Sequence, residues 1–248
     1  MSRILLTAAS RVGCVRSNNE DMVLAYDKLV RSDAYRTEFM TENTERFVIA
    51  LADGMGGHRA GEVASEQALN SLKFFINDIP RGMETGEFEE TMMEWLDFIN
   101  DTINRQGHSD PTLLEMGTTL VGIIYYGGKY FWMNCGDSRL YRLRDGKLEQ
   151  MTTDHSLSNA NGEKKHSNII TNCIGADCKN SFLDLYEFTS DFHSGDTYML
   201  CSDGLNDMVS FEDIEKLMNE GRSANGLCEA AIEAGGFDNV SVCLFHVE

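Results

Sequence analysis

The sequence is poor in proline and in positive charge, and it contains no long apolar stretch. Two prolines occur in 248 residues and 42% of the residues are hydrophobic, which excludes a disordered or low-complexity chain. No apolar run approaches the ~20 residues of a membrane-spanning helix. The 21 basic residues stand against 40 acidic ones, and the formal charge of −19 argues against nucleic acid or an anionic membrane as a partner.

The seven cysteines are odd in number and scattered from Cys14 to Cys243. Several lie inside apolar runs, as Cys201 does, where a free cysteine behaves as a small hydrophobic residue. The apolar segment 4–9 is too short for the core of a signal peptide, and Arg11 interrupts it. We therefore expect a reduced, cytoplasmic protein, with a monomer as the default oligomeric state.

Hydrophobic periodicity predicts helices that come in pairs and strands that come in runs. Apolar residues at steps of three and four predict helices over 60–79, 88–103, 211–219 and 225–234, the first of them ended by Pro80. Apolar runs predict strands at 4–10, 22–26, 46–52, 118–126, 129–135, 139–144, 147–151, 183–188, 197–201 and 240–247.

Tight turns at 127–128 and 145–146 make the neighbouring strands antiparallel. The central strands are apolar at nearly every residue, so both of their faces should be covered. The chain is therefore predicted to be an α+β protein, with two antiparallel sheets packed face to face and helices outside them. We treat residues 1–248 as a single domain, because no linker or repeat divides them.

Four aspartates, Asp53, Asp137, Asp203 and Asp238, each follow an apolar run or a tight glycine. A carboxylate at the end of a buried strand is partly desolvated, so something must compensate its charge. An ordinary Asp-Gly turn is the alternative for any one of them, as the hairpin at 145–146 illustrates. Four such residues in one context, with few Lys or Arg beside them, favour a shared site.

Oxygen ligands without a nearby histidine select Mg²⁺ or Mn²⁺ rather than Zn²⁺. Two such ions can activate a water molecule and clamp a phosphate. Gly54 lacks a side chain, so its carbonyl or an incoming phosphate can approach closely. Upstream, Arg16 offers a planar fork for phosphate oxygens, and Glu20 and Asp21 can bind metal or hold metal-bound water.

Together these segments resemble the PP2C-type (PPM) metal-dependent protein phosphatases along almost the whole chain, in the form typical of the bacterial branch. The matching motifs, in order, are RSNNED from Arg16, DGMGGH from Asp53, GTTL from Gly117, NCGDSRLYRLRDG from Asn134, TTDHSL from Thr152, SDGL from Ser202 and DNVSV from Asp238.

The resemblance implies a four-layer α/β/β/α sandwich with the metal site at one end. It implies that Asp53 bridges two ions, that the Gly54 carbonyl binds one of them, and that Asp203 and Asp238 bind the other. Asp137 matches the position that, with Asp203, holds a third and weaker ion.

The resemblance also implies that Asp21 and Glu20 lie at the second ion and that Arg16 binds the phosphate. The implied reaction hydrolyses phosphoserine and phosphothreonine in substrates of Ser/Thr kinases, with water or hydroxide activated at the two-metal Mn²⁺ or Mg²⁺ centre. Arg16, Asp21 and Glu20 are thus the expected catalytic residues.

Two departures from the family pattern leave details open. Met55 stands where many relatives have a histidine proposed as the general acid, and His58 is an alternative. The flap at about 155–168 is shorter than in the family, which leaves substrate choice undetermined. A metal-binding pseudophosphatase or scaffold and a phosphatase of a small metabolite remain alternatives, although no motif carboxylate is missing.

Overall fold

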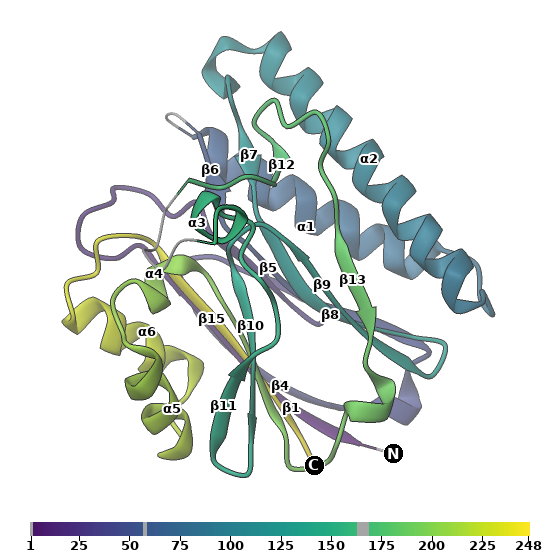
Figure 1. The fold of residues 1–248 in the computed structure, drawn as a ribbon, viewed down its shortest axis with the longest axis vertical. Coiled ribbons are helices and arrows are strands. Elements are labelled where there is room, and N and C mark those ends of the chain that lie inside the picture. Colours follow the sequence, from purple (N-terminus) through teal and green to yellow (C-terminus); the bar gives the residue numbers. More distant parts are fainter. Residues whose placement is uncertain (1, 57–58, 163–168) are drawn as a thin grey trace.

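The computed structural model describes residues 2–56, 59–162 and 169–248, which form two large antiparallel sheets between layers of helices (Figure 1). One sheet has the order β11-β10-β14-β15-β1-β4, with bounds Lys147–Gln150, Arg139–Arg144, Thr197–Cys201, Val240–Val247, Arg3–Arg11 and Ala34–Met40. The other has the order β13-β9-β8-β5-β2-β3, with bounds Asp184–Glu187, Lys129–Cys135, Leu120–Tyr126, Arg46–Ala52, Met22–Ala25 and Lys28–Val30. A small third sheet joins β12 (Ile174–Gly175), β7 (Gly117–Thr118) and β6 (Gly54–Met55).

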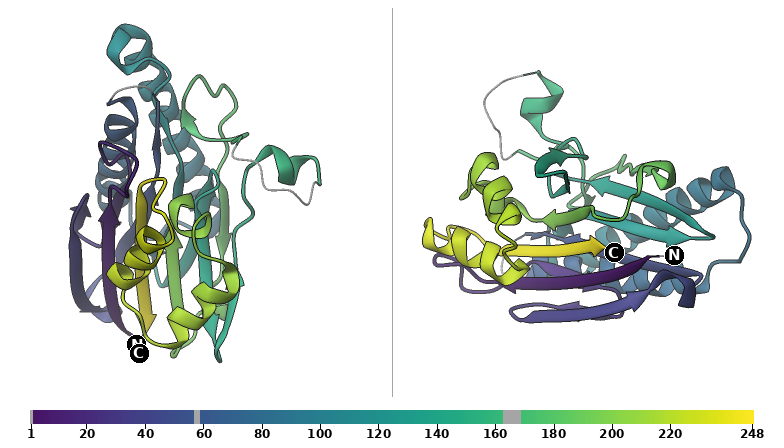
Figure 2. Two further views of the ribbon diagram at one scale, coloured as in Figure 1. Left: turned by 90° about the vertical axis from the view of Figure 1, so that its left-hand side faces the viewer. Right: turned by 90° about the horizontal axis from the view of Figure 1, so that it is seen from below.

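The helices form the two outer layers, with α1 and α2 on one side of the sheets and α5 and α6 on the other (Figure 2). Their bounds are Ala60–Asp78 for α1, Thr85–Ser109 for α2, Phe211–Asn219 for α5 and Ala224–Glu233 for α6. Single turns form α3 (Leu157–Ala160) and α4 (Asp203–Asn206), and 3₁₀ turns lie at Thr41–Asn43, Pro111–Leu113 and Thr189–Asp191. Within the described ranges, no helix combines the length and apolarity that crossing a bilayer requires.

Strand β5 explains why the central strands are apolar at almost every position. Val48 and Ala50 face the core beneath α1 and α2, whereas Phe47, Ile49 and Leu51 face the core between the two sheets. Side chains alternate between the faces of a strand, so a strand covered on both faces must be apolar throughout. The predicted four-layer sandwich is therefore observed.

The sheets differ from the sequence expectation in several places, and the short strands β3, β6 and β12 were not predicted. The strand expected over 118–126 is interrupted at Thr119, because the backbone N–H of Thr119 donates to the carbonyl of Asp53 at 2.8 Å. Strand β4 was not predicted, since it lies at a sheet edge beside β1 and alternates exposed residues such as Arg36 and Glu38 with half-buried ones. An edge strand of this kind has too little apolar pattern to be recognised.

The aromatic contact between α2 and its sheet offers a test of the outer layer. Phe88 is buried and lies 4.8 Å from the ring of Tyr126 and 4.7 Å from that of Phe131. Phe88→Ala should lower the free energy of unfolding by about 3–5 kcal/mol through lost burial and the remaining cavity. Phe98→Ala, on the exposed face of α2, should change it by less than about 0.5 kcal/mol in the same urea titration. Equal effects of the two variants would contradict this packing.

Candidate metal centre

The predicted site residues come together at the end of the sandwich opposite the two termini (Figure 1). Strand β5 ends at Ala52, and its antiparallel partner β2 begins at Met22, so Asp53 and Asp21 lie at the same edge. In the other sheet, β14 ends at Cys201, opposite Val242 of β15, which brings Asp203 and Asp238 together at the corresponding end of that sheet. Antiparallel pairing within each sheet, together with the face-to-face packing of the two sheets, thus gathers carboxylates that are up to 217 residues apart in the sequence.

Asp21 is the most deeply buried of these carboxylates. One of its oxygens accepts a hydrogen bond from the Ser202 hydroxyl at 2.8 Å, and the Ser202 Oγ in turn accepts from the backbone N–H of Ser241. The other oxygen, Oδ1, has no hydrogen-bond partner among the described residues. Burial raises the pKa of Asp21 to about 6, against the effect of the Ser202 hydroxyl.

The GTTL motif fixes Asp53. Its carbonyl accepts from Thr119 N–H at 2.8 Å and from the Thr118 hydroxyl at 2.9 Å, and its N–H donates to Thr119 Oγ1 at 3.0 Å. The carboxyl pKa of Asp53 is raised well above its usual range, first by burial and then by the charges of Asp21 and Asp203. The backbone of Asp53 is therefore held in place at a position where the charge of its own carboxylate is poorly solvated.

Asp203 and Asp137 complete the buried part of the group. Burial, followed by the charge of Asp137, raises the pKa of Asp203 to about 8. Asp137 is itself buried and follows Gly136, whose φ is +127°. A Cβ on Gly136 would lie 2.7 Å from the side chain of Thr119, so only glycine allows this close approach.

Gly54 sits between these carboxylates and α1. Its N–H donates to the carbonyl of Glu20 at 3.2 Å, and a Cβ on it would lie 2.1 Å from the carbonyl oxygen of Gly61. A side chain at this position is therefore impossible without moving α1 away from the edge.

Arg16 and Glu20 lie at the open side of the group. Arg16 Nη2 donates to Asp238 Oδ2 at 2.6 Å, in a pair whose side chains are 51% and 38% exposed. Burial raises the pKa of Glu20, although the charge of Arg16 opposes the shift. Arg16 and Glu20 both line a cavity of about 610 Å³.

Asn239 ties the segment that carries Arg16 to the start of β15. Its Nδ2 donates to the carbonyls of Val12 and Asn18, both at 2.9 Å, and its Oδ1 accepts from the N–H of Glu20 at 2.8 Å. Asn239 thus holds the N-terminal loop from Val12 to Glu20 against the start of β15.

The donor set fits a hard divalent cation. The site offers several carboxylates with raised pKa values, and Oδ1 of Asp21 is buried without a hydrogen bond from any residue that the structure describes. Within the described ranges, no three acidic, histidine or cysteine side chains already converge as a coordination sphere. The group is therefore a cluster of interacting carboxylates rather than a preformed cage, and its chemistry suits Mg²⁺ or Mn²⁺.

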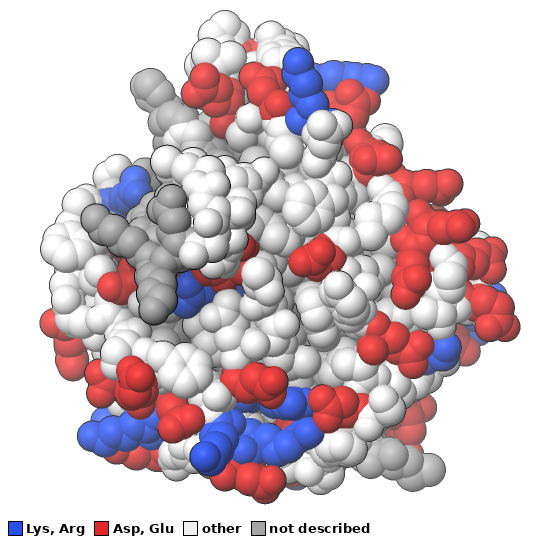
Figure 3. All heavy atoms as spheres, in the orientation of Figure 1, with Lys and Arg blue, Asp and Glu red and all other residues white. Residues whose placement is uncertain are grey.

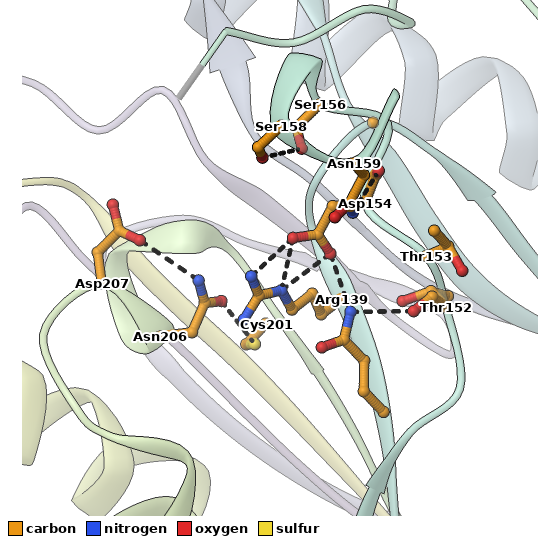
Figure 4. Close-up of polar contacts among 12 residues, drawn as sticks. Arg139, Thr152, Thr153, Asp154, Ser156, Ser158, Asn159, Cys201, Asn206 and Asp207 are labelled. Atoms are coloured by element: carbon orange, nitrogen blue, oxygen red, sulfur yellow. Dashed lines mark hydrogen bonds and ion pairs between the residues drawn. The ribbon is translucent and has the colours of Figure 1, made fainter. Parts of the chain in front are cut away.

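A salt bridge that the sequence did not reveal anchors the start of the flap to this edge (Figure 4). Arg139 of β10 meets Asp154 in a two-pronged pair, with Nε–Oδ1 at 2.9 Å and Nη2–Oδ2 at 2.6 Å. Gln150 donates to the same carboxylate, and Asn159 of α3 donates to the Asp154 carbonyl, both at 2.9 Å. Arg139 pairs with Cys201 across the sheet, so the start of the flap is linked to β14, the strand that leads to Asp203.

His155 links the start of the flap to β13 and to the backbone before Asp137. Its Nδ1 accepts from the backbone N–H of Gly136 at 3.0 Å, which places the ring proton on Nε2, 3.0 Å from Asp184 Oδ2. His58, considered above as a general acid, and Lys164, Lys165 and His166 of the flap lie outside the described residues.

The buried hydroxyl groups are the functional residues that the sequence did not indicate. Ser202, Ser241, Thr118 and Thr119 hold the carboxylates or their backbone, yet in the sequence they are ordinary strand-end residues. All four lie in recognised motifs, Thr118 and Thr119 in GTTL, Ser202 in SDGL and Ser241 in DNVSV, and motif membership was the signal that could have found them.

Comparison with known proteins identifies the family. The profile of the family described as Protein phosphatase 2C matches residues 25–230. The chain belongs to the protein phosphatase 2C family. The fold and the recognised motifs of this PP2C chain therefore agree with each other, and the resemblance inferred from the motifs is confirmed.

The bacterial character of this PP2C chain is also confirmed. It is 34% identical over 261 residues to the serine/threonine protein phosphatase PstP of Mycobacterium tuberculosis, in a match covering all of this chain and 46% of the relative. The chain thus spans about half the length of that relative. The serine/threonine phosphatase Stp of Listeria welshimeri is 34% identical over 212 residues, covering 79% of this chain and 83% of the relative.

Solved structures confirm the α+β sandwich. The S. agalactiae serine/threonine phosphatase superposes with a TM-score of 0.82 at 30% identity, covering 99% of this chain and 100% of the other. The PstP catalytic domain in complex with two manganese ions superposes with a TM-score of 0.74 at 34% identity, covering 99% of each chain.

The raised pKa values predict how pH changes the stability of the metal-free protein. Between about pH 4 and about pH 8, the folded chain holds protons on Asp21 and Asp203 that the unfolded chain has released. Stability should therefore fall as pH rises through this window. Urea titrations in chelator from pH 5 to pH 8 measure how steeply the free energy of unfolding falls with pH, and Asp203→Asn should reduce this slope. If the substitution leaves this slope unchanged, the raised pKa of Asp203 is contradicted.

The Arg139–Asp154 pair predicts a large stability effect. The two side chains are 15% and 5% exposed, so Asp154→Asn leaves a poorly solvated guanidinium without its charge partner. We expect a loss of about 3–5 kcal/mol in the free energy of unfolding, measured by urea denaturation. The matched control is Asp101→Asn on α2, whose pair with Arg105 is exposed and should contribute under about 1 kcal/mol. If the loss in the free energy of unfolding is no larger than that of the control, the charge of Arg139 is balanced by groups other than Asp154.

Proposed function

We propose that this protein is a metal-dependent serine/threonine protein phosphatase. The observation that carries the proposal is the group of desolvated carboxylates, Asp21, Asp53 and Asp203, gathered beside Arg16 in a chain of the PP2C family. The two manganese ions of the PstP catalytic domain support a two-ion centre here as well.

The site residues divide between the ions and the substrate. Asp53 would bridge two Mn²⁺ or Mg²⁺ ions, with Gly54 on one side and Asp203 and Asp238 on the other. Asp137 and Asp203 would hold a third and weaker ion. When bound, the ions supply activation of water and neutralisation of phosphate charge.

The chain's own residues position the substrate and the water. Arg16 shares one terminal nitrogen with Asp238, so its remaining donors can bind a phosphate oxygen. Asp21 and Glu20 would accept protons from water near the second ion, and burial raises the pKa of each carboxyl, which favours proton uptake. The Arg16–Asp238 bond keeps the guanidinium beside the carboxylates before substrate arrives.

The remaining assignments belong to the same proposal. The substrates are phosphorylated proteins made by Ser/Thr kinases, and neither nucleic acid nor a membrane is a partner. In the view of Figure 3, acidic side chains are spread over the surface while basic ones gather mainly along its lower edge, which supports this choice. We further propose one domain over residues 1–248, with a short flap at about 155–168, acting as a cytoplasmic monomer; the seven cysteines, all in described segments and none in a disulfide, support a reducing compartment.

Metal removal and one substitution test the proposal together. Chelation should abolish hydrolysis of phosphothreonine peptides and Mn²⁺ should restore it, whereas phosphotyrosine peptides and small phosphate esters should react more slowly. Asp53→Asn should lower kcat by at least about 100-fold and should also reduce the rise in Tm that Mn²⁺ produces. Asp145→Asn, at an exposed hairpin turn, is the matched control and should change neither. Full activity in chelator, or normal rates for Asp53→Asn, would disprove the metal mechanism.

A further inference from the structure

Two large apolar side chains lie exposed beside the candidate site. Val15 and Phe237 are each 63% exposed, and they directly precede Arg16 and Asp238 in the sequence. Both line the cavity of about 610 Å³ that also contains Arg16 and Glu20. We call Val15 and Phe237 the apolar rim.

The rim is held rigidly, although it belongs to two loops. The Cys14 N–H donates to the carbonyl of Gly236 at 2.7 Å, which joins the loop of Val15 to the loop of Phe237. Gly13 brings the backbones closer still, since a Cβ there would lie 2.2 Å from the carbonyl oxygen of Asp238. Asn239 adds its bonds to Val12 and Asn18. Arg16 and the rim are therefore presented in one fixed arrangement.

Phe237 does not fold back into the core. Gly235 has φ +136°, and a Cβ on it would lie 3.3 and 3.6 Å from carbons of the Phe237 ring. The ring thus lies over the backbone of Gly235 and keeps its outer surface in solvent. Exposed aromatic surface beside a charged anchor is typical of a peptide-binding site.

We propose that the apolar rim binds an apolar side chain adjacent to the phosphorylated residue of the substrate. This inference rests on the proposed phosphatase function. Arg16 lies in the same cavity and fixes the phosphate, so the neighbouring substrate residue falls within reach of Val15 and Phe237. A small phosphorylated metabolite has no such side chain, so the rim favours phosphopeptides, and among them those with Leu, Ile, Val or Phe beside the phosphoresidue.

Four phosphothreonine peptides test the preference. They carry Leu on the N-terminal side, on the C-terminal side, on both sides, or Ser on both sides of phosphothreonine. At least one Leu peptide should exceed the Ser peptide in kcat/KM on the order of tenfold, mainly through KM. Phe237→Ala should bring this ratio close to one, and Phe237→Leu should largely retain it. Phe74→Ala, which removes an exposed ring in the groove between α1 and α2, should leave the ratio unchanged.

Binding measurements separate failure of this inference from failure of the phosphatase function. Dissociation constants of the same peptides for the Asp53→Asn variant, alone and combined with Phe237→Ala, report docking without turnover. The proposed role of the apolar rim would be overturned by equal affinity and equal kcat/KM for Leu and Ser peptides. It would also be overturned by a preference for Leu peptides that survives Phe237→Ala. Metal-dependent hydrolysis of small esters with no phosphopeptide turnover would overturn the protein-phosphatase proposal, while the binding data would still decide for or against the rim.

Discussion

The crowding of poorly solvated carboxylates at one end of the sandwich is the constraint on which the rest of the site depends. Asp21, Asp53 and Asp203 all have raised pKa values, and burial is the largest cause for each. Moving apart would relieve the repulsion, but the chain prevents it. Asp53 is pinned by Thr118 and Thr119, and Asp21 and Asp203 are fixed by the strands they adjoin. The favourable folding free energy of the sandwich thus keeps these acidic side chains together against their mutual repulsion.

The loops around the cluster are built for rigidity in the same way. Asn239 uses both donors of its amide nitrogen and its carbonyl oxygen to hold Val12, Asn18 and Glu20. Glycines at 13 and 54 let backbones approach where any side chain would collide. Under the proposed function, rigid loops matter because misplacing a phosphate-binding side chain by about an ångström greatly lowers the reaction rate.

Apolar pattern and turn chemistry made much of the fold predictable. Strand β5 and helix α5 occur with the predicted bounds, because each is a strongly patterned segment with a clear stop. Four of the acidic positions were recognisable because each aspartate follows an apolar run or a tight glycine. The sequence could not reveal partners that only the tertiary fold creates. Ser202 under Asp21 is 181 residues away in sequence, and Arg139 finds Asp154 only after β10 and β11 have turned.

The choice of partners for the buried acids is itself informative. Asp21 rests on the Ser202 hydroxyl, a neutral group that satisfies one oxygen without cancelling the charge. An arginine in that position would form a buried ion pair and leave little negative charge for a cation. One arginine, Arg139, lies only two residues after Asp137 in the sequence. Its guanidinium group binds the carboxylate of Asp154 at the start of the flap. Arg16, which does contact the cluster, makes its bond to Asp238 on the half-exposed side, where water screens the interaction. The fold thus uses the half-buried guanidinium of Arg139 to hold the start of the flap and keeps the charge of the central carboxylates available for metal ions.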